Sequence, residues 1–275
     1  MSNLLSRLLV AVVAVPILLL LIYQDNPIFV WGLVFAGSSI AMYEFFSMTK
    51  LDKTDSLVSV VIGMAVLAAF YWLGEKPGGY LLCMVASVVA PMFYYLFRFG
   101  DQSTVASRLT STITGIIYAG VFLSFVALIK RDFGAAMGPD KAGHLIIMLL
   151  GSAWLSDTGG YFAGKGIGGP KLYPAVSPNK TWSGSIGGVI CAIGGGIAIK
   201  IFLLEQLEWI DVILLAGVGS ILGQLGDLAE SLIKRSTGVK DSGAILPGHG
   251  GILDRIDAVI LIAPYFYLYV VIRGW

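Results

Sequence analysis

The chain has 275 residues, of which 57% are hydrophobic and 13% are charged, and its formal net charge at pH 7 is +1. A soluble domain carries about 25% charged residues, so this composition excludes an ordinary soluble protein and indicates an integral membrane protein. The small net charge gives no reason to expect a nucleic-acid partner. The two histidines, His144 and His249, are too few for a multi-histidine metal centre. Any metal ion should therefore be a hard cation held by carboxylates.

A membrane-spanning helix needs about 20 mostly apolar residues. On this scale the sequence predicts an all-α polytopic membrane protein with about nine transmembrane helices. In chain order, the predicted spans are Leu4–Ile22, Ile28–Ser47, Leu57–Leu73, Tyr80–Phe97, Thr112–Ile129, Leu145–Phe162, Gly184–Leu203, Val212–Ile233 and Ile256–Ile272.

The distribution of lysine and arginine predicts the orientation of these spans. The connections on the side of the N-terminus carry 12 of these residues, and those on the other side carry six. Because cytoplasmic connections are enriched in lysine and arginine, we expect the N-terminus and two polar loops, at about 163–183 and 234–255, to be cytoplasmic. The C-terminus should lie outside.

Small residues recur at a four-residue spacing in two of the spans, at Gly184 and Gly188 and at Gly219 and Gly223. Such spacing lets two helix backbones approach closely. The contact could lie within one helical bundle or at the seam of a dimer.

An ionisable residue, Asp157, lies inside the predicted sixth span. Charge within a membrane is costly, so Asp157 is a candidate functional residue. The polar loop that follows matches G-x-x-x-x-G-K at Gly159–Lys165. However, Gly166 stands where a P-loop needs serine or threonine, and the segment leaves a membrane helix rather than a strand, so we do not expect a P-loop.

Hydrogen-bond donors and one cation precede the predicted seventh span, at Ser177, Asn179, Lys180 and Thr181. This composition suits contacts with the base, ribose or phosphates of a nucleotide. The same residue types cap the N-termini of helices, so an ordinary cap is the structural alternative.

The end of the predicted eighth span carries Asp227, Glu230, Ser231 and Lys234 on one helical face. Two acids one turn apart could hold Mg²⁺, which proteins bind through one or two carboxylates together with substrate phosphates. The structural alternative is a Glu230–Lys234 pair within the helix, with Asp227 buried and either paired or protonated.

A second acidic pair, Asp254 and Asp257, opens the predicted ninth span. These acids could complete a metal site, or they could simply favour the positive end of the helix dipole. Just before them, His249, Gly250 and Gly251 offer backbone N–H groups that could bind an anion, although paired glycines also form tight turns. His249 could act as a general base, bind a phosphate or be structural.

Basic residues gather in the same segment. Lys234, Arg235 and Lys240 suit the binding of a triphosphate, but they could also follow from the cytoplasmic location of the loop. Asp241 and Arg255 belong to the same polar run.

The polar run resembles the signature of the CDP-diacylglycerol synthases, or phosphatidate cytidylyltransferases. The matching pattern is Ser231-x-x-Lys234-Arg235-x4-Lys240-Asp241-x-Gly243-x-x-Leu246-Pro247-x-His249-Gly250-Gly251-x-x-Asp254-Arg255-x-Asp257. The segments 177–181 and 156–161 resemble two further motifs of the family, whereas the N-terminal half is similar only in hydropathy. The chain departs from the family at Ser183, where a glutamate is common, and at Gly160, where alanine is common.

The resemblance implies a nucleotidyltransferase that makes CDP-diacylglycerol and pyrophosphate from CTP and phosphatidate. We expect N-terminal transmembrane helices over residues 1–130 and a C-terminal transmembrane catalytic region, with CTP- and metal-binding loops, over residues 131–275. The resemblance also implies Mg²⁺ as cofactor, with a second cation left open, and a homodimer. From the short N-terminus without a long soluble extension we expect a bacterial inner-membrane protein, and from the lysine and arginine count we expect its site to face the cytoplasm.

The resemblance also implies roles for individual residues. The expected catalytic residues are Asp227, Asp254, Lys234, Lys240 and His249. The expected metal ligands are Asp227 and Asp254, with Asp257 and Glu230 beside them or in the shell around them. The expected substrate-binding residues are Asp157, Ser177, Asn179, Lys180, Thr181, Arg235, Asp241, Gly250, Gly251 and Arg255.

Two other functions are compatible with parts of the sequence. A CTP-dependent polyprenol kinase would transfer the γ-phosphoryl group, but the linear signature argues against it. A transporter would use the intramembrane acids to line an ion path. Against this stand the absence of inverted-repeat symmetry in hydropathy and the gathering of polar residues at one membrane face.

Overall fold

The computed structural model describes residues 3–245 and 250–275, with side chains described from residue 12 onward. The first part of the chain forms α1 (Asn3–Ile22), α2 (Ile28–Met48), α3 (Lys53–Leu73), α4 (Gly79–Phe97), α5 (Gln102–Gly115), the π-helix η1 (Ile116–Val121), α6 (Phe122–Leu128), the π-helix η2 (Ile129–Phe133) and α7 (Gly134–Met137). The second part forms α8 (Pro139–Gly166), β1 (Lys171–Tyr173), β2 (Ser177–Thr181), α9 (Trp182–Phe202), α10 (Trp209–Val212), the π-helix η3 (Ile213–Val218), α11 (Gly219–Thr237) and α12 (Leu253–Arg273).

The prediction of an all-α polytopic membrane protein is confirmed. Among the described residues, seven helical runs are long and apolar enough to cross a membrane: Ile28–Met48, Lys53–Leu73, Gly79–Phe97, Gln102–Met137, Trp182–Phe202, Trp209–Thr237 and Leu253–Arg273. The other two predicted spans lie in α1, whose side chains are described only over Val12–Ile22, and in α8. A total of nine spans therefore stays a prediction.

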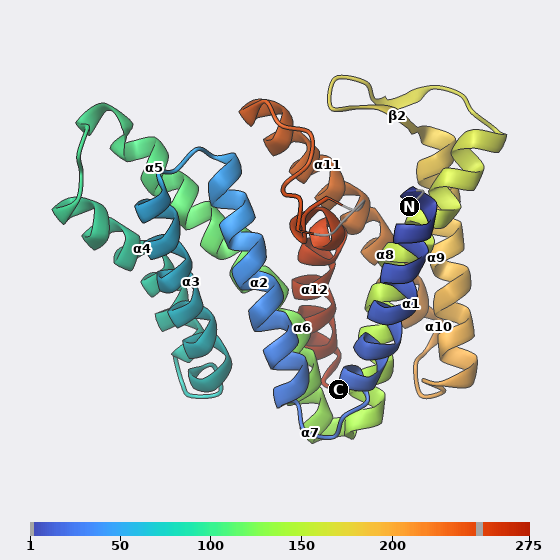
Figure 1. Cartoon of the computed structure of the whole chain (residues 1–275). Helices are drawn as coiled ribbons and strands as arrows, with labels where there is room; N and C mark the ends of the chain where they lie inside the picture. Colours follow the sequence, from blue (N-terminus) through green and yellow to red (C-terminus); the bar gives the residue numbers. More distant parts are fainter. Residues whose placement is uncertain (1–2, 246–249) are drawn as a thin grey trace.

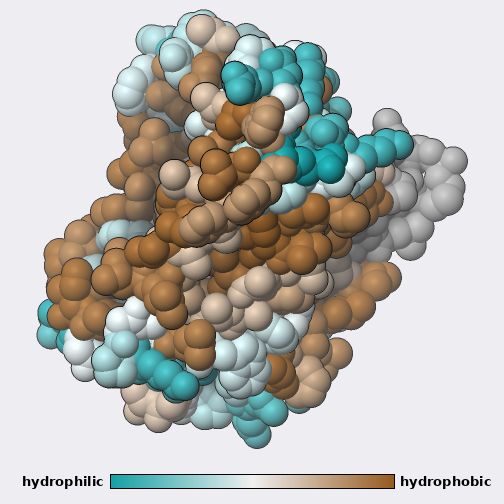
Figure 2. Space-filling model, turned by 90° about the vertical axis from the view of Figure 1, so that its left-hand side faces the viewer, coloured by the Kyte–Doolittle hydropathy of each residue, from teal (hydrophilic) through white to brown (hydrophobic). Residues whose placement is uncertain are grey.

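The outer surface of the bundle suits contact with lipid. Large apolar side chains are exposed along α4 and α9, among them Leu81, Phe93, Ile190 and Phe202. Figure 2 shows apolar residues over the middle of one face and hydrophilic residues toward its upper and lower ends. This distribution is the one that a bilayer requires of a multi-pass protein.

The polar connections gather at one end of the bundle. The β1–β2 hairpin joins α8 to α9 at the top of Figure 1, and the connection from α11 to α12 descends from the same end. The C-terminus lies at the opposite end. Residues far apart in the sequence are thereby brought together where the two polar loops were expected.

Glycines allow α8 and α9 to pack almost backbone to backbone. A Cβ atom on Gly184 would lie 2.8 Å from the carbonyl oxygen of Gly160, and one on Gly188 would lie 2.7 Å from that of Ser156. Gly219 and Gly223 likewise allow α11 to approach α12 closely, because these two residues face Phe266 and Ile262 of α12. Of the two alternatives for these glycines, close packing within one bundle is confirmed.

Candidate active site

A cavity of ≈ 490 Å³ opens between α8, α9 and the hairpin. Asp157 and Asn179 both line it, as the sequence predicted for a nucleotide-binding region. The remaining lining residues are Ser156, Gly160, Tyr161, Gly164 and Lys165 of α8, Leu172, Lys180 and Thr181 of the hairpin, Gly184 and Ser185 of α9, and Gln224 of α11. The cavity thus combines a carboxylate, two lysines and several hydroxyl and amide groups.

Two of the predicted substrate-binding residues hold the hairpin in place. Thr181 is the N-cap of α9, and its Oγ1 accepts a hydrogen bond of 3.1 Å from the backbone N–H of Gly184. The cap that the sequence offered as an alternative is therefore present, although Thr181 also lines the cavity. Ser177 pairs with Tyr173 in the hairpin and is not among the described residues that line the cavity.

Ser183 takes a structural role at the position where the resembling family commonly has glutamate. Its hydroxyl donates to the backbone carbonyl of Gly168 and lies 3.0 Å from the hydroxyl of Thr181. These contacts fix the glycine-rich turn before the hairpin to the first turn of α9.

An ion pair connects the cavity to α11. The Nζ of Lys180 lies 2.5 Å from Oδ2 of Asp227, and both side chains are partly exposed. The other oxygen of Asp227 accepts a hydrogen bond of 3.3 Å from the Ser231 hydroxyl. Two residues that the sequence assigned to different functions, nucleotide binding and metal binding, therefore lie in direct contact.

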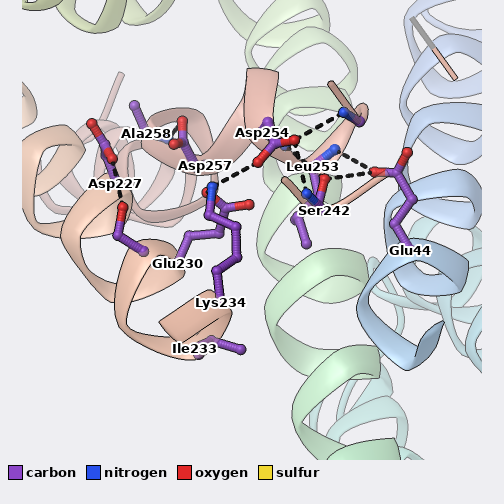
Figure 3. A network of polar contacts seen from close by, with 12 residues as sticks. Glu44, Asp227, Glu230, Ile233, Lys234, Ser242, Leu253, Asp254, Asp257 and Ala258 are labelled. Atoms are coloured by element: carbon purple, nitrogen blue, oxygen red, sulfur yellow. Dashed lines mark hydrogen bonds and ion pairs between the residues drawn. The ribbon is translucent and has the colours of Figure 1, made fainter. Parts of the chain in front are cut away.

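Lys234 bridges the two acidic helices. Its Nζ lies 2.6 Å from Oε2 of Glu230 in α11 and 2.6 Å from Oδ1 of Asp254 in α12 (Figure 3). The intrahelical Glu230–Lys234 pair, offered as the structural alternative, is present, and the second carboxylate extends it. All three side chains are largely withdrawn from solvent, so removal of Lys234 would leave two carboxylates without their counter-ion.

Asp254 also organises the connection that leads into α12. Its Oδ2 accepts hydrogen bonds from the backbone N–H groups of Gly251 at 2.8 Å and Ser242 at 2.9 Å. Gly250 has a φ of +78°, and a Cβ atom there would lie 2.6 Å from Asp254 Oδ2. In the described conformation the paired glycines thus bend the backbone around a carboxylate of the protein itself.

Glu44 of α2 belongs to the same network and was missed in the sequence. Its carboxylate accepts hydrogen bonds from the Ser242 hydroxyl at 3.2 Å and from the backbone N–H groups of Ile252 at 3.1 Å and Leu253 at 2.8 Å (Figure 3). The available signal was the one that identified Asp157, an acid inside a predicted span.

Asp257 faces the crossing of α11 and α12, within electrostatic range of Asp227 and Glu230. The helices can meet there because residue 226 is glycine: a Cβ atom on Gly226 would lie 2.5 Å from the carbonyl oxygen of Asp257. The crossing therefore sets the spacing of the acidic residues.

Substitution of Gly226 by alanine is expected to force the two helices apart at this crossing. The added methyl group meets backbone, which cannot rotate away, so we expect a loss of about 1–3 kcal/mol in the free energy of unfolding. The thermal unfolding midpoint in detergent measures the effect. Gly37→Ala is the matched control, because nothing lies within 4 Å of its Cβ position. Equal midpoints for the two variants would contradict this view of the crossing.

Two buried oxygen atoms near the acidic residues have no hydrogen-bond partner in the described part of the chain. They are Oε1 of Glu230 and the hydroxyl of Tyr118, which belongs to η1 and is 8% exposed. Tyr118 lies within electrostatic range of Glu230 and Asp257. No motif in the sequence pointed to Tyr118. Buried polar atoms are rarely left unpaired, so both atoms are suited to contact a bound group.

The carboxylates do not form a ready-made metal cage. Within residues 3–245 and 250–275, no three acidic, histidine or cysteine side chains are grouped to hold a metal ion. Instead, Lys180 and Lys234 lie against three of the four predicted ligands. Mg²⁺ needs only one or two carboxylates when substrate phosphates supply further oxygens. The four predicted carboxylate ligands, including the unpaired oxygen of Glu230, therefore fit Mg²⁺ if substrate phosphates supply the remaining oxygens.

The remaining predicted residues lie at the margin of the site. Arg235, Lys240 and Asp241 are exposed at the end of α11 and in the connection that follows it. Arg255 is exposed in the first turn of α12, within electrostatic range of Asp157. His249 lies outside the described residues.

The fold and the site define a polytopic membrane protein with paired acids and lysines at one end of its bundle. The model of the cytidylyltransferase family matches residues 5–273. The chain is 36% identical over 274 residues to the phosphatidate cytidylyltransferase of Brucella suis, covering 98% of this chain and 94% of the relative. The phosphatidate cytidylyltransferases of Bacillus subtilis and Thermotoga maritima are 32% and 33% identical, covering 97% and 98% of this chain and 97% and 96% of the relatives.

The chain therefore belongs to the cytidylyltransferase family. It is an enzyme of the nucleotidyltransferase class, as the resemblance of its signature implied.

Proposed function

We propose that the protein transfers the cytidylyl group of CTP to phosphatidate and releases pyrophosphate. The observation that carries the proposal is the Lys180–Asp227 ion pair. It joins a cavity lined by polar groups to a network of acids and lysines, in a bundle whose outer surface suits lipid. The names of the relatives from Brucella, Bacillus and Thermotoga support the choice of substrates.

The chemistry asks the protein mainly to bring two anions together. A phosphate oxygen of phosphatidate attacks the α-phosphorus of CTP, the bond from that phosphorus to the oxygen bridging to the β-phosphate breaks, and pyrophosphate leaves with the electron pair. Phosphatidate is already ionised at neutral pH, so no strong base is needed. Lys180, Lys234 and Lys240 would offset the charge, and rate enhancement would come from positioning and electrostatics.

Asp157, Asn179 and Lys180 are the proposed contacts of CTP in the cavity, with Arg255 near Asp157 outside the cavity lining. Arg235 and Lys240, exposed beside the network, would meet phosphatidate or the departing pyrophosphate. Asp241, Gly250 and Gly251 would shape the connection that brings Lys240 to the substrates.

Mg²⁺ is the proposed cofactor. Asp227 and Asp254 would hold it, with Glu230 and Asp257 beside them. When bound, the ion would neutralise the phosphate charge that develops as pyrophosphate leaves.

The site is proposed to face the cytoplasm from a bacterial inner membrane. Support comes from the excess of lysine and arginine on the side that carries the hairpin and the α11–α12 connection, and from the bacterial relatives. A homodimer stays a prediction.

Chelation is expected to abolish turnover without unfolding the protein. With excess EDTA, phosphatidate-dependent release of pyrophosphate from CTP should fall to background, and Mg²⁺ should restore it. The thermal midpoint should stay within a few degrees, because the lysine bridges already pair three of the carboxylates. Full activity in EDTA would contradict the metal assignment.

The function itself is tested by pyrophosphate release from purified protein in detergent. The proposal expects release only when both CTP and phosphatidate are present. Release from CTP alone, or none in folded protein supplied with Mg²⁺, would contradict it.

A further inference from the structure

Glu44 is a carboxylate buried within a membrane helix, with 3% of its surface exposed. No cation pairs with it among the described residues, and its bonds come instead from the Ser242 hydroxyl and the N–H groups of Ile252 and Leu253. A buried carboxylate without such bonds would be strongly destabilising, so these contacts are needed to keep it in place.

The donors lie at one place, the connection that leads into α12. Leu253 opens α12, and its N–H and that of Ile252 are among the groups that a helix start leaves without internal partners. Glu44 therefore caps α12 from another helix, and the positive end of the helix dipole favours its charge.

The connection can approach Glu44 this closely because two of its residues lack side chains. A Cβ atom on Gly243 would lie 2.5 Å from Oε1 of Glu44, and one on Gly251 would collide with Oε2. Both glycines belong to the linear signature, and neither has a positive φ. Their contact with Glu44 gives a spatial reason for glycine at these two positions.

Ser242 links these contacts of Glu44, which we call the Glu44 clamp, to Asp254 and Lys234. Its hydroxyl donates to Glu44 and accepts a hydrogen bond of 3.3 Å from the N–H of Asp254, while its own N–H donates to Asp254 Oδ2. Asp254 in turn holds Lys234. A displacement of Glu44 would therefore move two of the residues proposed to act on the substrates.

We infer that Glu44 is a positioning residue that, from the N-terminal part of the chain, holds residues 242–243 and 251–253 in their active conformation. The inference rests on the proposed function only for its effect on turnover. The clamp itself can be measured without any substrate.

The first experiment compares Glu44→Gln with Ser38→Ala, a matched change of a buried polar residue on the same helix. Ser38 has no hydrogen-bond partner in the described part of the chain. In Glu44→Gln one amide hydrogen-bond donor must face backbone donors, so kcat should fall by about 10- to 100-fold. The KM for CTP should change little, because the cavity residues are untouched. Ser38→Ala should retain wild-type constants.

Ser242→Ala provides a milder variant. It should lower kcat less than Glu44→Gln does, and the double variant should be no worse than Glu44→Gln alone, because both changes break one chain of contacts. The inference would be overturned if the two losses in kcat multiply in the double variant, or if Glu44→Gln retains the wild-type kcat.

Limited digestion by trypsin tests the clamp independently of activity. Lys240 precedes the clamped residues, whereas Lys171 lies in the hairpin, and both are exposed. Glu44→Gln should increase cleavage after Lys240 relative to cleavage after Lys171, and Ser38→Ala should leave the ratio unchanged. An unchanged ratio in Glu44→Gln would overturn the clamp. An inactive wild-type protein with the expected ratios would instead refute the proposed function alone.

Discussion

Replacement of Asp254 by asparagine is expected to lower kcat by about 10²- to 10³-fold. One oxygen of Asp254 pairs with Lys234 and the other accepts two backbone N–H groups. Asparagine has a single acceptor oxygen, so its amide must face either the ammonium group of Lys234 or the N–H groups of Ser242 and Gly251. Either arrangement leaves a donor opposed to a donor at the reaction centre.

The rate of pyrophosphate release measures this effect in protein that is shown to be inserted and folded. Glu205→Gln is the control, because it makes the same chemical change at an exposed position in the connection between α9 and α10. Turnover of Asp254→Asn within a few-fold of the control would remove Asp254 from the mechanism.

Asp227→Asn is expected to have the second large effect, a loss of about 10²-fold or more in kcat. The substitution removes the partner of Lys180 and a proposed metal ligand at once. Lys180 would keep its charge but lose the contact that directs it from the hairpin toward α11. We therefore expect the KM for CTP to change less than kcat.

A double-mutant cycle with Lys180→Met separates the two roles of Asp227. If the ion pair couples the cavity to the network, the double variant should be less impaired than the product of the two single losses predicts. Strictly multiplicative losses would show that Lys180 and Asp227 act independently, against the single site proposed here.

The fold class and one side of the site could be predicted from the sequence because each has a local signal. Apolar runs mark the spans, and the polar segments at 177–181 and 231–257 carry their motifs in a row. The ion pair between Glu230 and Lys234 follows from helical spacing alone. The extent of the helices was less predictable: the polar α5 extends the predicted span Thr112–Ile129 to a continuous run, Gln102–Met137.

Neither of the residues that were missed belongs to a motif, and only Glu44 has a signal, as an acid inside a predicted span. Glu44 and Tyr118 come from the N-terminal part of the chain, and only the packing of α2 and η1 brings them to the acidic network. The β1–β2 hairpin lies in what was expected only as a polar loop, because three- and five-residue strands leave no clear alternation in the sequence. The Lys180–Asp227 and Lys234–Asp254 contacts likewise depend on how the hairpin, α11 and α12 meet.

The most direct test of the account uses CTP labelled with ³²P at either the α- or the γ-phosphate, with phosphatidate and Mg²⁺. Cytidylyl transfer predicts that the α-label appears in the lipid and the γ-label in pyrophosphate, in equal amounts. Transfer of the γ-label to lipid with release of CDP would contradict the account and indicate a lipid kinase. Failure of both labels to move in folded protein would contradict it as well.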